Sequence, residues 1–433
     1  MKFNKICVIG LGYIGLPTAS TFATAGLQVT GVDVNPQIVT GLQNGELHIY
    51  EPGLRTLVQA ALKSGHLTIR EKPEAADAFV IAVPTPFFDD KRADLSFVKS
   101  ATESIVPVLQ RGNLVVLEST SPPRTTVDLL APILERSGLT AGADFHLAYS
   151  PERVLPGRIL EELIHNARVI GGIDQVSAEM GRDLYRLFVQ GDIILTEATT
   201  AEMVKLMENT SRDINIAIAN EFSRLADRFG VDVWEAIEIA NLHPRVKILK
   251  PGPGVGGHCI SVDPWFFVEA APDITTLIAA ARHVNDSQPH FVIDLVKRAA
   301  GGHLHGKRIA ALGLSFKPDV DDFRESPAVE VVKLLQAEGA IVSGYDPYLN
   351  GLEIAGVDLY KDLALAVDGA DVVLVLVAHQ ELCSLDPQTL RCLTPAHILV
   401  DTVNVFGGWD LESSGFELHR LGVNCCPSRT LAR

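Results

Sequence analysis

Short apolar runs alternate with helical patterns along the first part of the chain. Five runs end in Gly, Asp, Pro or Ser, which is typical of buried strands that stop at a turn. They occupy residues 5–12, 27–34, 78–85, 113–120 and 145–151. Residues 167–173 and 192–197 continue the alternation. Because alternating strands and helices build parallel sheets covered on both faces, this region predicts a doubly wound α/β domain.

The middle of the chain has a helical pattern of apolar residues instead of alternating strands and helices. Residues 199–231 keep helical spacing with hardly a breaker, which is long for a globular helix and indicates subunit packing. Residues 233–241 continue as helix, a Gly/Pro-rich stretch at 249–258 interrupts the pattern, and 273–300 resume it. This region is predicted to be all-α.

Strand-like runs return at the end of the chain and predict a second, smaller α/β domain. They occupy residues 307–316, 340–347, 371–379 and 397–404. The predicted fold class is therefore α/β, with two Rossmann-like doubly wound domains joined by a long-helix central domain. The predicted domains are residues 1–198, 199–300 and 301–433.

Composition and net charge exclude some classes of function. The 433 residues are 47% hydrophobic and 21% charged, as in globular proteins, and the formal charge is −16. A negative chain argues against nucleic acid or an anionic membrane as partner, although local cations can still bind an anionic substrate. The start of the chain lacks a signal-peptide pattern and no apolar run is long enough to span a bilayer, which predicts a cytoplasmic protein.

The six cysteines show neither the spacing of a disulfide scaffold nor that of a zinc site. No metal is expected, and the chain is predicted to be reduced. No role is argued for the last two. The cysteines are Cys7, Cys259, Cys383, Cys392, Cys425 and Cys426.

A glycine motif marks a dinucleotide site. Gly10, Gly12 and Gly15 follow the first strand and open a helical run, so the helix N-terminus faces the phosphates. Asp33 ends the next strand, eighteen residues after Gly15. An acid there accepts hydrogen bonds from a ribose diol and repels a 2′-phosphate, which favours NAD over NADP. A purely structural glycine turn is the alternative.

Two further strand ends carry polar residues at the edge where ligands bind in open parallel sheets. Pro84 and Thr85 follow one strand, and Glu118, Ser119 and Thr120 follow another. Thr85 and Thr120 are candidates to touch the cofactor or a reacting oxygen, although a simple turn or cap explains them equally well.

Residues 251–266 carry the strongest candidate chemistry. Their glycines let the backbone fold tightly, and Cys259 and Asp263 lie four residues apart. A cysteine in such a loop is a candidate nucleophile if nearby cations lower its pKa. Without that support, a buried inert cysteine remains the simpler interpretation.

Six motifs in this order resemble the UDP-glucose/GDP-mannose dehydrogenase family. Beside the glycine motif they are SPERVLPG (150–157), KLMENTSRD (205–213), HPRV (243–246), GGHCISVDP (256–264) and FKPDVDDFRESPA (316–328). The resemblance covers nearly the whole chain and is strongest to the branch that oxidises UDP-N-acetylmannosamine. It implies an NAD-binding domain, a helical dimerisation domain with the cysteine loop, and a UDP-binding domain.

The resemblance also implies residue roles. Cys259 matches the nucleophile, Asp263 the acid beside it, and Lys205 with Asn209 the pair that stabilises an oxyanion at C6 of the sugar. Thr120 and Glu152 match residues that hold or activate a water. Arg245 resembles an arginine that reaches the substrate of the neighbouring subunit in a homodimer. Further cofactor contacts are implied for Tyr13, Ile14, Pro84, Thr85 and Arg324, and substrate contacts for Arg153, Arg212, His243, Gly256 and Lys317.

One position departs from the UDP-glucose branch, which carries a second glutamate four residues after the one matched by Glu152. Pro156 stands at that place, so Glu152 is the better candidate for the base. Arg153, absent from that branch, is hypothesised to read the acetamido or hydroxyl groups of the sugar.

The expected reaction converts an alcohol to a carboxylate, which removes four electrons and needs two NAD. A thiolate holds the intermediate aldehyde as a thiohemiacetal, and water later cuts the thioester. A UDP-N-acetylglucosamine or UDP-glucose dehydrogenase and a two-electron dehydrogenase of the 6-phosphogluconate type are the rival enzymes. A non-catalytic nucleotide-sugar binding protein is the rival outside the enzyme class.

Overall fold

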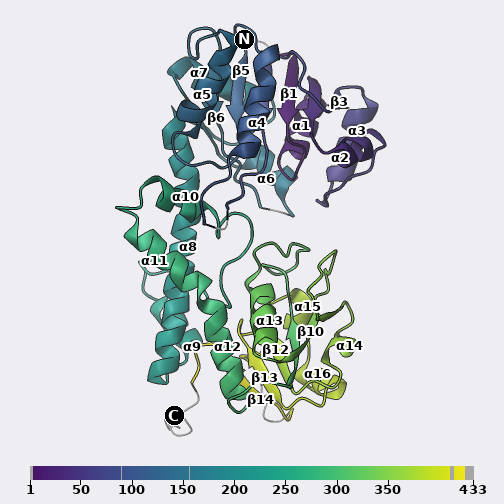
Figure 1. The fold of residues 1–433 in the computed structure, drawn as a ribbon, viewed down its shortest axis with the longest axis vertical. Helices are drawn as coiled ribbons and strands as arrows, with labels where there is room; N and C mark the ends of the chain where they lie inside the picture. The colour runs from purple at the N-terminus through teal and green to yellow at the C-terminus, as the bar shows by residue number, and fades with distance from the viewer. Residues whose placement is uncertain (1–2, 89, 156, 410–413, 425–433) are drawn as a thin grey trace. The chain divides into compact units, whose positions relative to one another are not determined.

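The computed structural model describes residues 3–88, 90–155, 157–409 and 414–424 (Figure 1). Cys425 and Cys426 lie outside these residues. The chain divides into two compact units: unit 1 holds residues 1–208 and 265–272, and unit 2 holds residues 209–264 and 273–433. The point of division falls inside the longest helix, α8 (Ala198–Phe229). The division into three domains at residues 198 and 300 stays a prediction.

Unit 1 is built on an eight-stranded sheet with the order β3-β2-β1-β4-β5-β6-β7-β8. Its first six positions follow the 3-2-1-4-5-6 order of a dinucleotide-binding sheet. The strands are β1 (Lys5–Ile9), β2 (Gln28–Val32), β3 (Leu67–Arg70), β4 (Ala78–Ile81), β5 (Leu114–Leu117), β6 (His146–Tyr149), β7 (Arg168–Gly172) and β8 (Ile193–Glu197). The helices of this part are α1 (Gly15–Thr24), α2 (Pro36–Gln43), α3 (Leu54–Lys63), α4 (Ser96–Ile105), α5 (Ala131–Leu134), α6 (Ile159–His165) and α7 (Gln175–Tyr185).

Alternation along the strands produces two separate cores in unit 1. Ile6 and Val8 of β1 join a cluster with side chains of α1, α3 and α7, whereas Cys7 and Ile9 join a second cluster with side chains of α4 and α8. Successive strand residues point to opposite faces, so strands that are apolar at every position need helices on both sides. The predicted doubly wound architecture is confirmed.

Unit 2 contains the second sheet, with six strands in the order β11-β10-β9-β12-β13-β14. The same alternation places Ile309 and Ala311 in one cluster and Ala310 and Leu312 in another. The strands are β9 (Arg308–Leu312), β10 (Ile341–Tyr345), β11 (Asp358–Tyr360), β12 (Val372–Val375), β13 (Ile398–Asp401) and β14 (Glu417–Arg420). The helices after β9 are α13 (Pro327–Ala337), α14 (Leu363–Val367), α15 (Gln380–Cys383) and α16 (Pro387–Leu393).

The predicted helical middle is also present, with α8 drawn in teal in Figure 1. It is followed by α9 (Val233–Ala240), α10 (Asp263–Ala270), α11 (Thr276–Asp286) and α12 (Gln288–Ala299). Residues 273–300, expected as one helical stretch, form two helices that meet at Ser287. Pro289 has no N–H to continue the ladder of α11, and its ring is tolerated in the first turn of α12.

The sequence did not predict three edge strands, nor that one strand is antiparallel to its neighbour. β3, β11 and β14 are three or four residues long and partly exposed, so they lack the apolar run that marks the central strands. β7 is antiparallel to β6, because residues 150–167 connect the two strands at one edge of the sheet without a crossover.

A buried polar network in unit 2 ties the glycine-rich stretch to two helices. Arg282 of α11 is 1% exposed and donates to the Oδ1 atom of Asp213 on α8 over 2.5 Å. Asn285 donates to the same Asp213 oxygen over 2.8 Å and accepts from Asn220. The Oδ1 atom of Asn220 in turn accepts the backbone N–H of Gly252 over 3.0 Å. The segment that leads to Cys259 is thereby fixed to α8.

No described helix has both the length and the apolar character that a membrane crossing requires.

Arg282→Met is expected to lower the free energy of unfolding by about 3–5 kcal/mol, because it leaves Asp213 buried without its cation. Burial already raises the pKa of Asp213, and Arg282 opposes that shift. Urea denaturation measures the loss. The matched control is Arg298→Met, which breaks an exposed pair with Asp227 of α8 and should cost less than about 1 kcal/mol. Equal losses in the two variants would contradict the role given to burial.

Candidate active site

The turn between β1 and α1 has the steric requirements of a dinucleotide loop. Gly10 has a φ of +91°, and a Cβ there would lie 2.5 Å from the carbonyl oxygen of Ala82. A Cβ on Gly15 would lie 1.8 Å from the carbonyl oxygen of Gly10. A Cβ on Gly12 would meet no described atom within 4 Å. The backbone packing of the turn therefore requires glycine at positions 10 and 15. A side chain at position 12 would instead point into the space that the pyrophosphate of a dinucleotide occupies.

Asp33 is held at the end of β2 beside this turn. Its Oδ2 atom accepts the backbone N–H of Leu11 over 3.0 Å, and its Oδ1 atom accepts that of Asn35 over 2.9 Å. Two backbone donors fix the carboxylate and leave further lone pairs for a ribose diol. Tyr13 and Ile14 are half-buried just before α1. These residues fit NAD.

The ends of β4 and β5 lie next to each other, because the two strands are parallel neighbours. The hydroxyl of Ser119 donates to the carbonyl oxygen of Val83 over 2.7 Å and joins the two strand ends. Pro84 is exposed, and Thr85 and Thr120 are half-buried. The structure thus gathers these three predicted residues at the carboxyl edge that also carries the glycine turn.

Glu152, in the segment after β6, is held by a buried arginine. The Nη2 atom of Arg168 donates to one oxygen of Glu152, and the backbone N–H of Arg153 donates to the other over 2.7 Å. Nη1 of Arg168 donates to Ser150 over 2.9 Å and to Glu118 over 3.2 Å. Arg168 was not predicted from the sequence. One guanidinium therefore orients the candidate base.

The segment around Glu152 is also anchored on both sides. The buried carboxylate of Glu51 accepts the backbone N–H groups of Gly157 and Ile159, each over 2.8 Å. Arg153 reaches Glu208 of α8, with its Nη2 atom 2.6 Å from a carboxylate oxygen. The arginine that was hypothesised to read the sugar is thus already paired with a carboxylate in unit 1.

Lys205 and Asn209 lie one helical turn apart on α8, on the same face of the helix. Lys205 is buried. The amide nitrogen of Asn209 donates to Asp263 over 2.5 Å. The backbone N–H of Asp263 donates to the carbonyl oxygen of Cys259 over 2.8 Å. Unit 2 therefore brings three predicted residues together: Cys259, Asp263 and Asn209.

The loop that carries Cys259 is pressed against residues 316–327 of the same unit. The backbone N–H of Gly257 donates to the carbonyl oxygen of Arg324 over 3.1 Å. A Cβ on Gly257 would lie 2.7 Å from the ring of Phe316, and one on Gly256 would lie 2.3 Å from the carbonyl oxygen of Glu325. Packing alone therefore explains why glycine stands at both positions, and the substrate contact of Gly256 stays a prediction.

The sulfur of Cys259 has a histidine beside it. Its Sγ atom lies 3.0 Å from the Nδ1 atom of His258. An imidazole at this distance can take the thiol proton and stabilise the thiolate. His258 was missed in the sequence, although its place next to the candidate nucleophile in GGHC was a usable signal.

The remaining predicted residues are more exposed. Arg324 is exposed and makes a bidentate pair with Asp322, at 2.9 and 2.6 Å. Burial opposes the charge of Asp322, but Arg324 and the nearby His258 still hold the pKa of that carboxyl below its usual value. Lys317 is half-buried, whereas Arg212, His243 and Arg245 are exposed.

The fold and these residues define a nicotinamide-dependent dehydrogenase with a cysteine loop. Family models agree along the chain: the NAD binding domain of the UDP-glucose/GDP-mannose dehydrogenase family matches residues 4–189, its central domain residues 199–287 and its UDP binding domain residues 310–408. The chain belongs to the UDP-glucose/GDP-mannose dehydrogenase family. Its cofactor is NAD, and its substrate class is the UDP-sugars.

Similar proteins cover almost the whole chain. A UDP-N-acetyl-D-mannosamine dehydrogenase of Methanocaldococcus jannaschii is 47% identical over 97% of this chain and 96% of its own. An NDP-N-acetyl-D-galactosaminuronic acid dehydrogenase of Ralstonia nicotianae is 49% identical over 93% and 96%. The solved structure of a UDP-D-ManNAc dehydrogenase from Pyrococcus horikoshii has a TM-score of 0.90 and 41% identity, over 96% of this chain and 99% of its own.

Two glycine variants separate folding from cofactor binding. Gly15→Ala is expected to lower the free energy of unfolding by about 1–3 kcal/mol or more, because the new methyl group overlaps a backbone oxygen. Gly12→Ala should change stability by less than about 1 kcal/mol but raise the Kd for NADH about tenfold or more, because the methyl group occupies the phosphate space. Denaturation and NADH fluorescence titration measure the two effects. Normal NADH binding by Gly12→Ala would refute the placement of the pyrophosphate.

His258→Gln is expected to slow alkylation of Cys259 by iodoacetamide at neutral pH by about threefold to tenfold, because the thiolate loses its imidazole partner. Peptide mass spectrometry follows the modification of each cysteine separately. Cys383 is exposed and serves as the internal control, whose rate should not change. An unchanged rate at Cys259 would show that the contact does not activate the thiol.

Proposed function

We propose that the chain oxidises the C6 alcohol of UDP-N-acetylmannosamine to the carboxylate, giving UDP-N-acetylmannosaminuronate and two NADH. The observation that carries the proposal is the grouping of Cys259, Asp263 and Asn209, a candidate nucleophile beside a paired acid and amide. Similarity to dehydrogenases named for this substrate over nearly the full chain supports the choice of sugar.

NAD, when bound, accepts the hydride that leaves C6 in each of the two oxidations. We assign its binding to the glycine turn, the ribose acid and the strand ends of unit 1, with Arg324 as a further contact. The residues are Gly10, Gly12, Tyr13, Ile14, Gly15, Asp33, Pro84, Thr85 and Thr120.

Cys259 retains the aldehyde in this proposal. Its thiolate adds to the aldehyde carbon and forms a C–S bond, and the resulting thiohemiacetal is oxidised to a thioester. Covalent capture divides a difficult reaction into easier steps and prevents loss of the aldehyde.

Lys205 and Asn209 supply the donors for the negative charge that develops on the C6 oxygen. An ammonium and an amide at fixed positions stabilise such an oxyanion without reorganisation. Asp263 accepts one N–H of the Asn209 amide, and the proposal assigns the second N–H to the sugar oxygen.

Glu152 takes the proton from the water that hydrolyses the thioester, directly or through Thr120. The oxygen of the water bonds to the acyl carbon, the C–S bond breaks, and Cys259 leaves as the thiolate. The carboxylate product then dissociates. Arg153, Arg212, His243, Arg245, Gly256 and Lys317 are proposed to contact the substrate.

An N-acetylgalactosamine nucleotide is a second candidate substrate, favoured by the 49% identity to the Ralstonia enzyme named for the corresponding uronic acid. UDP-N-acetylglucosamine and UDP-glucose remain alternatives, as does a binding protein without turnover.

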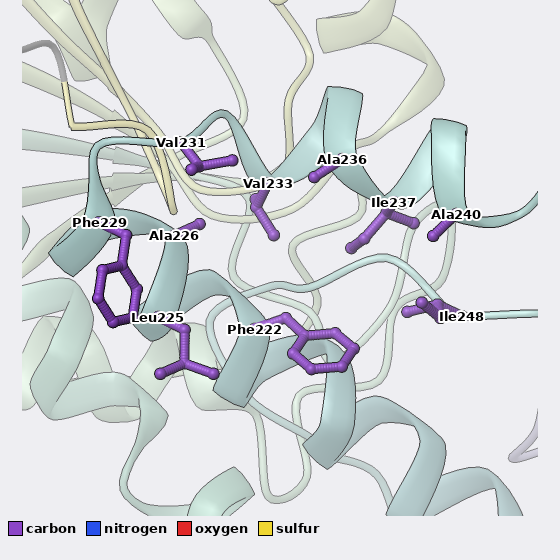
Figure 2. Close-up of a pocket in the computed structure, with 10 residues that line it drawn as sticks. All are labelled: Phe222, Leu225, Ala226, Phe229, Val231, Val233, Ala236, Ile237, Ala240 and Ile248. Carbon is purple, nitrogen blue, oxygen red and sulfur yellow. The ribbon is translucent and has the colours of Figure 1, made fainter.

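We further propose a cytoplasmic homodimer in which Arg245 reaches the substrate of the partner. Figure 2 shows an apolar pocket lined by side chains of α8 and α9, by Val231 between the two helices and by Ile248. Phe222, Leu225 and Phe229 on α8 are exposed large apolar residues at the end of that helix. An exposed apolar surface of this kind on a long helix supports subunit packing.

Limiting UDP-N-acetylmannosamine is expected to yield two NADH per sugar, measured by absorbance, with UDP-N-acetylgalactosamine, UDP-N-acetylglucosamine and UDP-glucose in parallel. Cys259→Ala should abolish the second NADH because the thioester cannot form. One NADH per sugar in the unmodified enzyme would favour a two-electron dehydrogenase. If none of the four sugars yields NADH but a UDP-sugar still binds measurably, a binding protein without turnover would be favoured.

A further inference from the structure

Glu118, at the end of β5, is a buried carboxylate that the proposed chemistry does not use. Its Oε1 atom accepts the hydroxyl of Tyr185 on α7 over 2.6 Å and Nη1 of Arg168 over 3.2 Å. Its Oε2 atom is buried and has no hydrogen-bond partner among the described residues. Burying a carboxylate oxygen without a hydrogen-bond partner disfavours the charged form of the carboxyl group.

Arg168 connects this carboxylate to Glu152. The arginine is 4% exposed, and its Cζ atom lies 4.2 Å from the ring centroid of Tyr185. Its two terminal nitrogens are divided: one bonds to Glu118 and Ser150, and the other bonds to Glu152. One cation therefore serves two carboxylates in a largely buried space, where charges interact more strongly than in water.

The charged and titratable groups that face Glu118 are Arg168 of β7, Tyr185 of α7 and Glu152 of the segment after β6. Burial raises the pKa of Glu118 to about 7, the charge of Arg168 opposes the rise, and the charge of Glu152 adds to it. Glu118 therefore changes its charge near neutral pH, at a fixed distance from the cation that holds Glu152.

We propose that Glu118 is a positioning residue of the reaction, which acts through Arg168 to set the orientation of the Glu152 carboxylate. The inference rests on the proposed role of Glu152 as the base of thioester hydrolysis. When Glu118 carries a proton, it no longer competes for Arg168, and the arginine holds the Glu152 carboxylate in the ion pair. When Glu118 is ionised, it competes for Arg168 and repels the second carboxylate, so Glu152 is held less tightly by the arginine and is free to turn toward the water.

The pH profile of kcat for complete oxidation tests this arrangement when hydrolysis limits the rate. The unmodified enzyme should show a rise centred near pH 7, where Glu118 ionises. Glu118→Gln keeps the shape of the side chain but not its charge, so the rise should disappear and kcat above neutrality should fall about threefold to tenfold. Tyr185→Phe removes a hydrogen bond that favours the ionised form, so the rise should move to higher pH.

Glu51→Gln is the matched control. Glu51 anchors the same segment through Gly157 and Ile159, and no hydrogen bond joins it to Arg168. This variant should keep the position of the rise even if kcat falls. A rise that survives in Glu118→Gln, or one that Glu51→Gln also abolishes, would overturn the proposal and leave Glu118 as mechanical support. Tyr185→Phe decides the question if Glu118→Gln does not fold, because an unmoved rise would then also overturn it.

A separate variant distinguishes this inference from the proposed function. Glu152→Gln should accumulate the acyl adduct on Cys259, detected as added mass on the intact protein. If no adduct forms, the assignment of Glu152 as the base fails, and the inference about Glu118 fails with it. If the adduct forms but Glu118→Gln keeps the normal pH profile, only the inference about Glu118 fails.

Discussion

The buried guanidinium of Arg168 is the interaction on which the candidate site in unit 1 depends. It begins β7 and reaches Glu118 at the end of β5 and Ser150 and Glu152 after β6. A cation at this depth is stable because carboxylates, a hydroxyl and an aromatic ring surround it. Because β7 runs antiparallel to β6, its first residue lies at the carboxyl end of the neighbouring strand. The reversal of one strand therefore places the arginine at the edge where ligands bind.

A second constraint, close packing of backbone, governs the cysteine loop in unit 2. Gly256 and Gly257 leave no room for a Cβ against Glu325 and Phe316, so the loop and the segment at 316–327 lie directly on each other. The N–H of Gly257 bonds to the carbonyl oxygen of Arg324 across that contact. Two motifs about sixty residues apart in the sequence thus form a single surface, and the position of Cys259 follows from sterics.

The long helix α8 takes part in the local packing of both units. Its N-terminal part packs on the first sheet through Ala198 and Ala201, and Glu208 pairs with Arg153. Its later turns hold Asp263 through Asn209 and the glycine-rich stretch through Asn220. Within each unit, the turns of α8 therefore hold groups that belong to different motifs.

The sequence by itself determined the class of fold and named the candidate residues for the chemistry. The central strands could be predicted because strands buried on both faces must be apolar at every position. The dinucleotide motif could be predicted because its glycines and its acid have a fixed local spacing; its residues are Gly10, Gly12, Gly15 and Asp33. The edge strands β3, β11 and β14 could not, since edges tolerate short and polar segments. Only the tertiary structure decided that Arg168 joins Glu118 to Glu152, that Asn209 meets Asp263, and that the cysteine loop rests on Phe316. Each of these contacts joins residues 16 to 59 positions apart, and no local pattern encodes which distant partner a buried charge or a glycine will meet.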